Sequence, residues 1–115
     1  MIRIKRAYDP ASPSDGYRIL IDRLWPRGIT KENLQADNWL KEVAPSTGLR
    51  KEFHSEKIDW QSFRKKYEAE LQGPSAAAFE ELKKLVKQHA TVTLLFASKS
   101  EEQNHALILQ KLLKG

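Results

Sequence analysis

The run TVTLLFA at residues 91–97 constrains the fold more than any other segment of the chain. It is rich in β-branched residues and almost wholly apolar, as expected of a central strand that is covered on both faces. Ser100 and Gln103 follow it with the spacing of a capping box, which predicts that the last helix opens there. A buried strand that leads into a capped helix is typical of an open α/β sheet.

The rest of the chain alternates between strand and helix patterns. Strands are expected at residues 2–6, 17–22 and 38–44, although a helix also fits the last of these segments. A short helical turn is expected after Thr30, and longer helices are expected from Ser46 to about Phe53, over residues 60–71, and from Ser75 to about His89. We therefore predict one three-layer α/β domain over residues 1–115, with a small, mostly parallel open sheet flanked by helices.

The composition is that of one globular domain. A chain of 115 residues supplies one core of useful size. It has no apolar run near the roughly 20 residues that cross a bilayer, and its start lacks the apolar stretch of a signal peptide, so we predict a cytoplasmic protein. Cysteine is absent, which excludes disulfides and thiol chemistry, and three dispersed histidines lead us to expect no metal site.

The net charge of +5 is concentrated near the N-terminus. Seven of the 20 Lys and Arg residues lie within residues 1–31, together with only three of the 15 Asp and Glu residues. This distribution is compatible with an anionic ligand, with weak affinity for nucleic acid, or with a surface that is merely solubilising.

The segment DRLWPRG follows the expected strand at residues 17–22 and is the first candidate site. Arg23 and Arg27 present planar forks that match phosphate or carboxylate oxygens, and Gly28 permits close approach of the backbone. Trp25 offers a flat surface to a ring, and Asp22 is a candidate base or a partner that holds Arg23. The alternative is a structural turn in which Trp25 belongs to the core and Asp22 pairs with Arg23.

The segment after residues 91–97 is the second candidate site. Lys99 adds a positive charge next to an expected helix N-terminus, where unpaired N–H groups favour an anion. Asn104 is a candidate to orient a ligand, and His105 is a candidate general base. The alternatives are that Ser100 only caps the helix and that His105 is a hydrogen-bonded core histidine.

Several motifs together carry a family resemblance that extends over nearly the whole chain. With DRLWPRG, the sequence resembles the domain-of-unknown-function family numbered 488, in its YeaO-like branch. The other matching stretches are Trp39-Leu40-Lys41-x-x-Ala44-Pro45-Ser46, Leu49-Arg50, Phe53-His54, Trp60-x-x-Phe63-x-x-x-Tyr67, Glu70-Leu71 and Asn104-His105-Ala106.

The resemblance implies a compact α/β domain whose activity is unassigned. More distant members of this family carry an Asp-Val-Arg after an early strand and a Cys-His-Arg in the last helix. Here Asp22-Arg23 and Asn104-His105-Ala106 resemble those motifs without the cysteine and the final arginine. Asp22, Arg23 and His105, together with Arg27, are therefore the residues that the resemblance carries over.

We expect the loops at the strand ends to bind a small anionic ligand, such as a nucleotide or a phosphorylated metabolite. Asp22 and His105 are the candidate acid and base groups if the protein is an enzyme; no cofactor is indicated. An alternative is a nucleic-acid-associated module that uses the basic N-terminal third, and a third is an interaction protein whose motif is purely structural. The first hypothesis requires the two loops to meet at one edge of the sheet.

Overall fold

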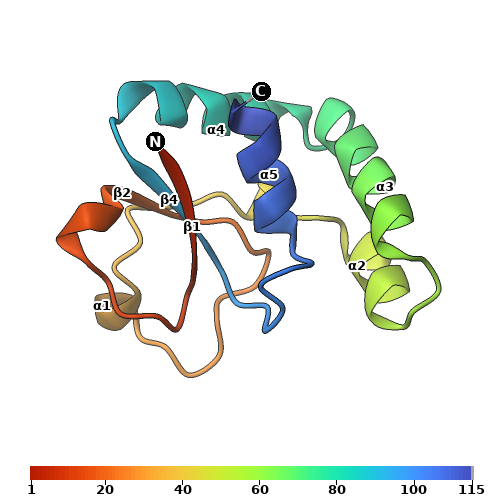
Figure 1. Cartoon of the computed structure of the whole chain (residues 1–115), viewed down its shortest axis with the longest axis horizontal. Helices are drawn as coiled ribbons and strands as arrows, with labels where there is room; N and C mark the ends of the chain where they lie inside the picture. The colour runs from red at the N-terminus through yellow and green to blue at the C-terminus, as the bar shows by residue number, and fades with distance from the viewer. Residues whose placement is uncertain (115) are drawn as a thin grey trace.

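The computed structural model describes residues 1–114, which form an α/β fold around a parallel sheet (Figure 1). Its strands are β1 (Ile2–Arg6), β2 (Tyr17–Leu20), β3 (Asn38–Trp39) and β4 (Val92–Phe96), in the order β1-β4-β2-β3. Each of these pairings is parallel. Strand β4 lies between β1 and β2, and all of its residues are buried. Its continuous apolar sequence is therefore that of a strand covered on both faces. The predicted α/β fold is confirmed.

The helices are distributed unequally over the two faces of the sheet. The four longer helices pack on one face, whereas the single turn of α1 covers the other face together with loops. The helices are α1 (Lys31–Leu34), α2 (Thr47–His54), α3 (Trp60–Gln72), α4 (Ala76–Gln88) and α5 (His105–Lys114), with 3-10 turns η1 (Pro13–Asp15) and η2 (Lys41–Val43). No helix within residues 1–114 has the length and apolar character of a membrane span.

The larger core lies between the sheet and the four longer helices. Helix α3 contributes Phe63, Tyr67 and Leu71, which recur at a spacing of four residues and are all buried. Burial of each such side chain contributes about 1.5–3 kcal/mol. Asp59 begins this helix by accepting a hydrogen bond from the Ser62 N–H at 2.8 Å. The predicted apolar stripe and N-cap are both confirmed.

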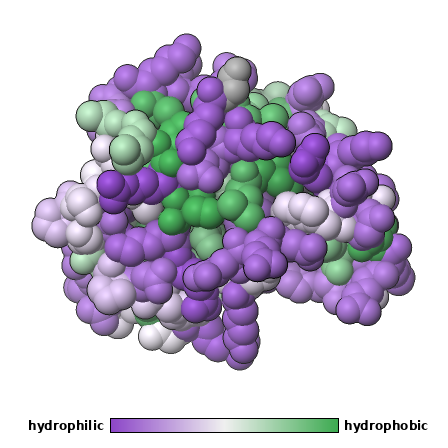
Figure 2. Space-filling model, in the orientation of Figure 1, coloured by the Kyte–Doolittle hydropathy of each residue, from purple (hydrophilic) through white to green (hydrophobic). Residues whose placement is uncertain are grey.

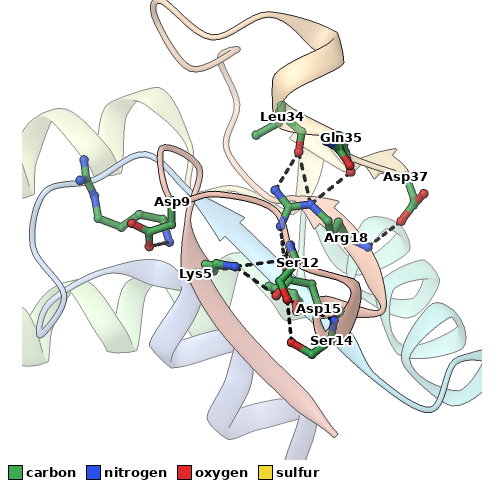
Figure 3. A network of polar contacts seen from close by, with 11 residues as sticks. Lys5, Asp9, Ser12, Ser14, Asp15, Arg18, Leu34, Gln35 and Asp37 are labelled. Atoms are coloured by element: carbon green, nitrogen blue, oxygen red, sulfur yellow. Dashed lines mark hydrogen bonds and ion pairs between the residues drawn. The ribbon is translucent and has the colours of Figure 1, made fainter.

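The opposite face of the sheet contains a buried polar network centred on Asp15 (Figure 3). The Asp15 carboxylate forms ion pairs with Lys5, at 3.1 Å, and with the buried guanidinium of Arg18. Arg18 also donates to the Leu34 carbonyl at 2.7 Å, which ties the end of α1 to the sheet. Burial raises the pKa of Asp15, but hydrogen bonds from the Ser12 N–H and from both cations outweigh it and leave the pKa below 3.8.

The segment at 38–44 departs from the predicted strand. Only Asn38–Trp39 pair with β2, and Lys41–Val43 form the 3-10 turn η2 instead. Leu40 and Val43 are both buried in the larger core, which a three-residue turn allows and an alternating strand does not. The prediction of a strand over residues 40–44 was therefore wrong.

The last helix begins later than predicted. Ser100 accepts a hydrogen bond from the Gln103 N–H at 3.0 Å, but these residues form a bend and α5 starts at His105. The Asn104 side chain accepts from the Leu107 N–H at 3.0 Å and is therefore the true cap. His105 thus occupies the first helical position rather than a position inside the helix.

The connections that leave β2 and β4 diverge at the carboxyl ends of these neighbouring strands. The chain after β2 leads to α1, whose Leu34 packs on one face, and the chain after β4 leads to α5 on the other face. Figure 1 shows the loops after β1, β2 and β4 at the same end of the sheet. In an open parallel sheet such a divergence leaves a crevice, which is the usual position of a ligand site.

Candidate functional site

A cavity of about 800 Å³ opens at this divergence. Its walls come from the segment after β2, from residues 44–45, from α2, the start of α3 and the connection between them, and from the chain between the end of β4 and the start of α5. This volume is in the range of small-molecule sites. The lining side chains used below are Asp22, Arg23, Arg50, Phe53, Lys57, Ile58, Asp59, Phe63, Lys99, Asn104 and His105.

Asp22 and His105 meet at the inner end of the cavity. Asp22 Oδ2 accepts a hydrogen bond from the Ala97 N–H at 2.9 Å, so the end of β4 fixes the carboxylate. Asp22 Oδ1 lies 3.2 Å from His105 Nε2, and that nitrogen also lies 2.9 Å from the Ile21 carbonyl oxygen. The two predicted acid and base candidates, 83 positions apart in the chain, are therefore adjacent.

Tyr67 is fully buried and packs behind His105. Its ring packs edge-on against His105, with 6.1 Å between the ring centroids, and its hydroxyl donates to the Val43 carbonyl at 2.5 Å. Complete burial raises the pKa of Tyr67 well above 10.0, and the nearby charges of Glu70 and Asp22 add to the rise. The Tyr67 hydroxyl is therefore neutral and positions the site without titrating near neutral pH.

Arg23 lines the cavity from the segment that follows β2. It donates Nη2–H to the Ala44 carbonyl at 3.1 Å and Nε–H to the Pro45 carbonyl at 3.4 Å. Within residues 1–114 it forms no salt bridge, so Asp22 does not pair with it. A half-buried guanidinium that contacts only carbonyl groups retains an uncompensated positive charge.

Further cations lie around the mouth of the cavity. Arg50, Lys57 and Lys99 are exposed and form no salt bridge within the described part of the chain. The Asp59 carboxylate, which also lines the cavity, is occupied as the cap of α3. Hydrogen bonds from Ser62 keep the pKa of Asp59 below 3.8. Asp22 and the exposed Glu56 also line the cavity, so its three carboxylates face four Lys and Arg side chains, a small excess of positive charge.

Lys99 and Asn104, predicted as ligand-binding residues, both line the cavity, but their settings differ from those expected. Lys99 lies in the connection before α5 rather than beside a helix N-terminus. Asn104 is buried, caps α5 and donates to the Ser100 carbonyl at 2.9 Å. Its side-chain groups are therefore engaged in positioning the helix that carries His105.

The structure does not bring Trp25, Arg27 and Gly28 to the cavity. Trp25 donates to the Ile29 carbonyl at 2.8 Å and packs against Trp39 in the smaller core on the other face. Arg27 is exposed, and Gly28 has a φ of 81°, which suits the turn that returns the chain. A ligand role for these three residues remains a prediction that the position of the cavity does not support.

The apolar wall and two of the cations were missed by the sequence reasoning. Phe53, Ile58 and Phe63 form an apolar wall, and Arg50 and Lys57 stand near it. Arg50 and Phe53 belong to motifs that carry the family resemblance, which was the available signal. Their place in the site depends on how α2 and α3 pack against the strand ends. Within residues 1–114 no three His, Asp or Glu side chains are grouped as metal ligands.

The fold and the cavity define a class: small α/β proteins with a cavity at the carboxyl ends of parallel strands. The chain belongs to the DUF488 family, because the sequence model of the family described as "Inactive DUF488-N3 subclade" matches residues 1–115. It is 51% identical over 116 residues to the uncharacterized protein YeaO of Escherichia coli, covering 99% of this chain and 97% of that protein.

A second relative is more distant and is also matched over nearly its whole length. The chain is 38% identical over 114 residues to the uncharacterized protein Rv3073c of Mycobacterium tuberculosis, covering 99% of this chain and 94% of that protein. No solved structure matches the chain significantly. The predicted membership of family 488 and similarity to YeaO are confirmed.

Proposed function

We propose that this protein binds a small anionic metabolite, a nucleotide or another phosphate ester, in the cavity between β2, β4 and the α2–α3 connection. The observation that carries the proposal is Arg23, a half-buried cation that lines the cavity and forms no salt bridge within residues 1–114. Such a charge is costly unless an anion accompanies it. Arginine, with its planar fork of donors, is well suited to phosphate oxygens.

The other walls of the cavity suit the rest of such a ligand. Phe53, Ile58 and Phe63 offer an apolar surface to a ring, and Lys57 and Lys99 add positive charge at the mouth. The start of α5 also borders the cavity, and the N-terminus of a helix favours negative charge.

Binding rather than catalysis is the activity that we propose. The subclade to which the chain belongs is described as inactive. Asn104 stands where the resemblance places the cysteine of more distant members, and it is engaged in capping α5. A protein that has this cavity but not that thiol is suited to holding a ligand.

The nucleic-acid alternative has less support. It depends on an open basic face that includes Lys5 and Arg18, but both of these side chains form ion pairs with Asp15, and Arg18 is buried. A salt-dependent affinity for nucleic acid over several phosphates is the result that favours this alternative.

Thermal unfolding with a panel of nucleotides and phosphate esters tests the proposal. Arg23→Ala removes the central cation, and Arg27→Ala is a matched control because Arg27 belongs to the same segment but lies outside the cavity. We expect a ligand that stabilises the parent and Arg27→Ala, and a 10–100-fold weaker affinity in Arg23→Ala, since a charged hydrogen bond contributes about 1.5–3 kcal/mol.

Lys99→Ala is a second variant, because Arg23 also binds two carbonyl groups that support the fold. Lys99 is exposed, so its removal leaves the fold intact while it lowers the affinity. Equal affinities in the parent and both cavity variants, or the absence of any stabilising ester, contradict the proposal.

A further inference from the structure

The two nitrogens of His105 have different surroundings. Nε2 lies 2.9 Å from the Ile21 carbonyl oxygen and 3.2 Å from Asp22 Oδ1. A carbonyl and an ionised carboxylate can only accept hydrogen bonds. The nitrogen between them must therefore carry a proton.

Asp22 reinforces this arrangement. Its Oδ2 is held by the Ala97 N–H, whereas its Oδ1 is buried and has no hydrogen bond within residues 1–114. A buried carboxylate oxygen without a donor is costly, and His105 Nε2 lies 3.2 Å from it, so a proton on Nε2 lessens that cost electrostatically while it hydrogen-bonds the Ile21 carbonyl. Asp22 is thus a positioning residue for the His105 ring.

The other ring nitrogen faces available space. Nδ1 has no partner in the described chain, and it is not among the buried polar atoms that lack one. Since His105 lines the cavity, Nδ1 is open to it. With the proton on Nε2, a neutral His105 presents a hydrogen-bond acceptor to whatever occupies the cavity.

We infer that Nδ1 of His105 accepts a hydrogen bond from a donor group on the ligand. The ligand is then a phosphate ester that also carries a free hydroxyl, as a ribonucleotide does. This inference rests on the proposed function. Arg23 takes the anionic group, the wall at Phe53 and Phe63 takes the apolar ring, and Nδ1 of His105 accepts from the hydroxyl.

Nitrogen NMR of the ¹⁵N-labelled protein tests the first part without any ligand. Long-range ¹H–¹⁵N spectra distinguish a ring nitrogen that carries a proton from one that does not. We expect Nε2 of His105 to carry a proton and Nδ1 to carry none. A proton on Nδ1, with or without one on Nε2, overturns the inference.

A matched pair of probes tests the second part: adenosine 5′-monophosphate and its 2′,3′-dideoxy analogue, which lacks the ribose hydroxyls. We expect the hydroxylated nucleotide to bind about 3–10-fold more tightly, since one neutral hydrogen bond contributes about 0.5–1.5 kcal/mol. His105→Gln retains a donor toward Ile21 but no acceptor at Nδ1, so it abolishes the preference. His105→Asn retains an acceptor near Nδ1 and restores it in part.

The outcomes separate this inference from the proposed function. Equal binding of both nucleotides by the parent overturns the inference and leaves anion binding intact. Failure of both nucleotides and of every ester in the panel overturns the proposed function and, with it, the inference. Thermal unfolding of each His105 variant shows whether it is folded before its affinity is compared.

Discussion

Two arginines five positions apart show how partners determine the role of a residue. Arg18, on β2, is buried, forms an ion pair with Asp15 and donates to the Leu34 carbonyl, so it stabilises the packing of α1 on the sheet. Arg23, just after β2, contacts only carbonyl groups and faces a cavity. The sequence presents both as basic residues near a strand, and only their neighbours distinguish a structural charge from one that is available to a ligand.

Two glycines offer a prediction at the same scale. Both Gly16 and Gly28 have positive φ, but a Cβ on Gly16 lies 2.3 Å from the Thr91 carbonyl oxygen, whereas one on Gly28 meets nothing within 4 Å. Gly16→Ala therefore combines backbone strain with steric overlap, and we expect it to lower the free energy of unfolding by about 2–4 kcal/mol.

Gly28→Ala is the control, because it introduces the strain alone, about 1–2 kcal/mol. Urea denaturation of the two variants measures the difference directly. Equal losses contradict the view that the close approach of Thr91 fixes the turn before β2.

At the scale of elements, side-chain caps set the helix boundaries. The predicted caps Ser46 and Asp59 accept hydrogen bonds from the Leu49 and Ser62 N–H groups at 3.2 and 2.8 Å. Helices α4 and α5 are exceptions: Ser75 makes no side-chain hydrogen bond to α4, and before α5 the Ser100 hydroxyl makes a local bend while Asn104 caps the helix. Two capping residues within one turn are indistinguishable locally, and packing against β1 and β4 selects between them.

A pair of serine and aspartate substitutions tests the role of the caps. Asp59 makes a capping hydrogen bond to α3, while Ser75 precedes α4 without a side-chain hydrogen bond to it. We expect Asp59→Ala to lower the free energy of unfolding by about 0.5–2 kcal/mol and Ser75→Ala to change it by less than about 0.5 kcal/mol. Chemical denaturation measures both, and a larger loss for Ser75→Ala argues against capping as the cause.

For the whole molecule, the two faces of the sheet differ in what they bury. One face holds the apolar core and ends at the cavity, and the other holds the network of Lys5, Asp15 and Arg18 (Figure 3). Figure 2 shows that the viewed face is largely hydrophilic, with apolar side chains gathered near its middle. Partly buried Ile4, Leu112 and Leu113 pack against the larger core from β1 and α5.

The Asp15 network predicts how stability depends on pH. The pKa of Asp15 in the folded protein lies below 3.8, so the folded state releases this proton more readily than the unfolded chain. The contribution of Asp15 is therefore complete above about pH 5 and is lost as the pH falls through the unfolded and then the folded pKa.

Urea unfolding at several pH values between about 3 and 6 measures this effect. As the pH is lowered from about 6 to about 3, we expect the free energy of unfolding of the parent to decrease. We expect a smaller decrease in Asp15→Asn, because this side chain cannot titrate. Identical slopes in the two proteins are the result that contradicts the prediction.

The sequence by itself determined the parallel sheet around residues 91–97, the apolar stripe of α3 and the caps at Ser46 and Asp59. Periodicity, β-branching and capping act between residues a few positions apart, so they are legible in the sequence. Asp22 and His105 were each predicted as candidate acid or base groups, but their contact with one another was not predicted.

Only the tertiary structure decided which residues share the cavity. The cavity includes Arg23 and Phe53 but not Arg27. The strand expected at residues 38–44 is also shorter in the structure than its sequence pattern predicted. The physical reason is that the cavity forms where distant segments diverge from neighbouring strands. Membership of the site therefore depends on the packing of α2, α3 and α5 around the sheet, which no local pattern encodes.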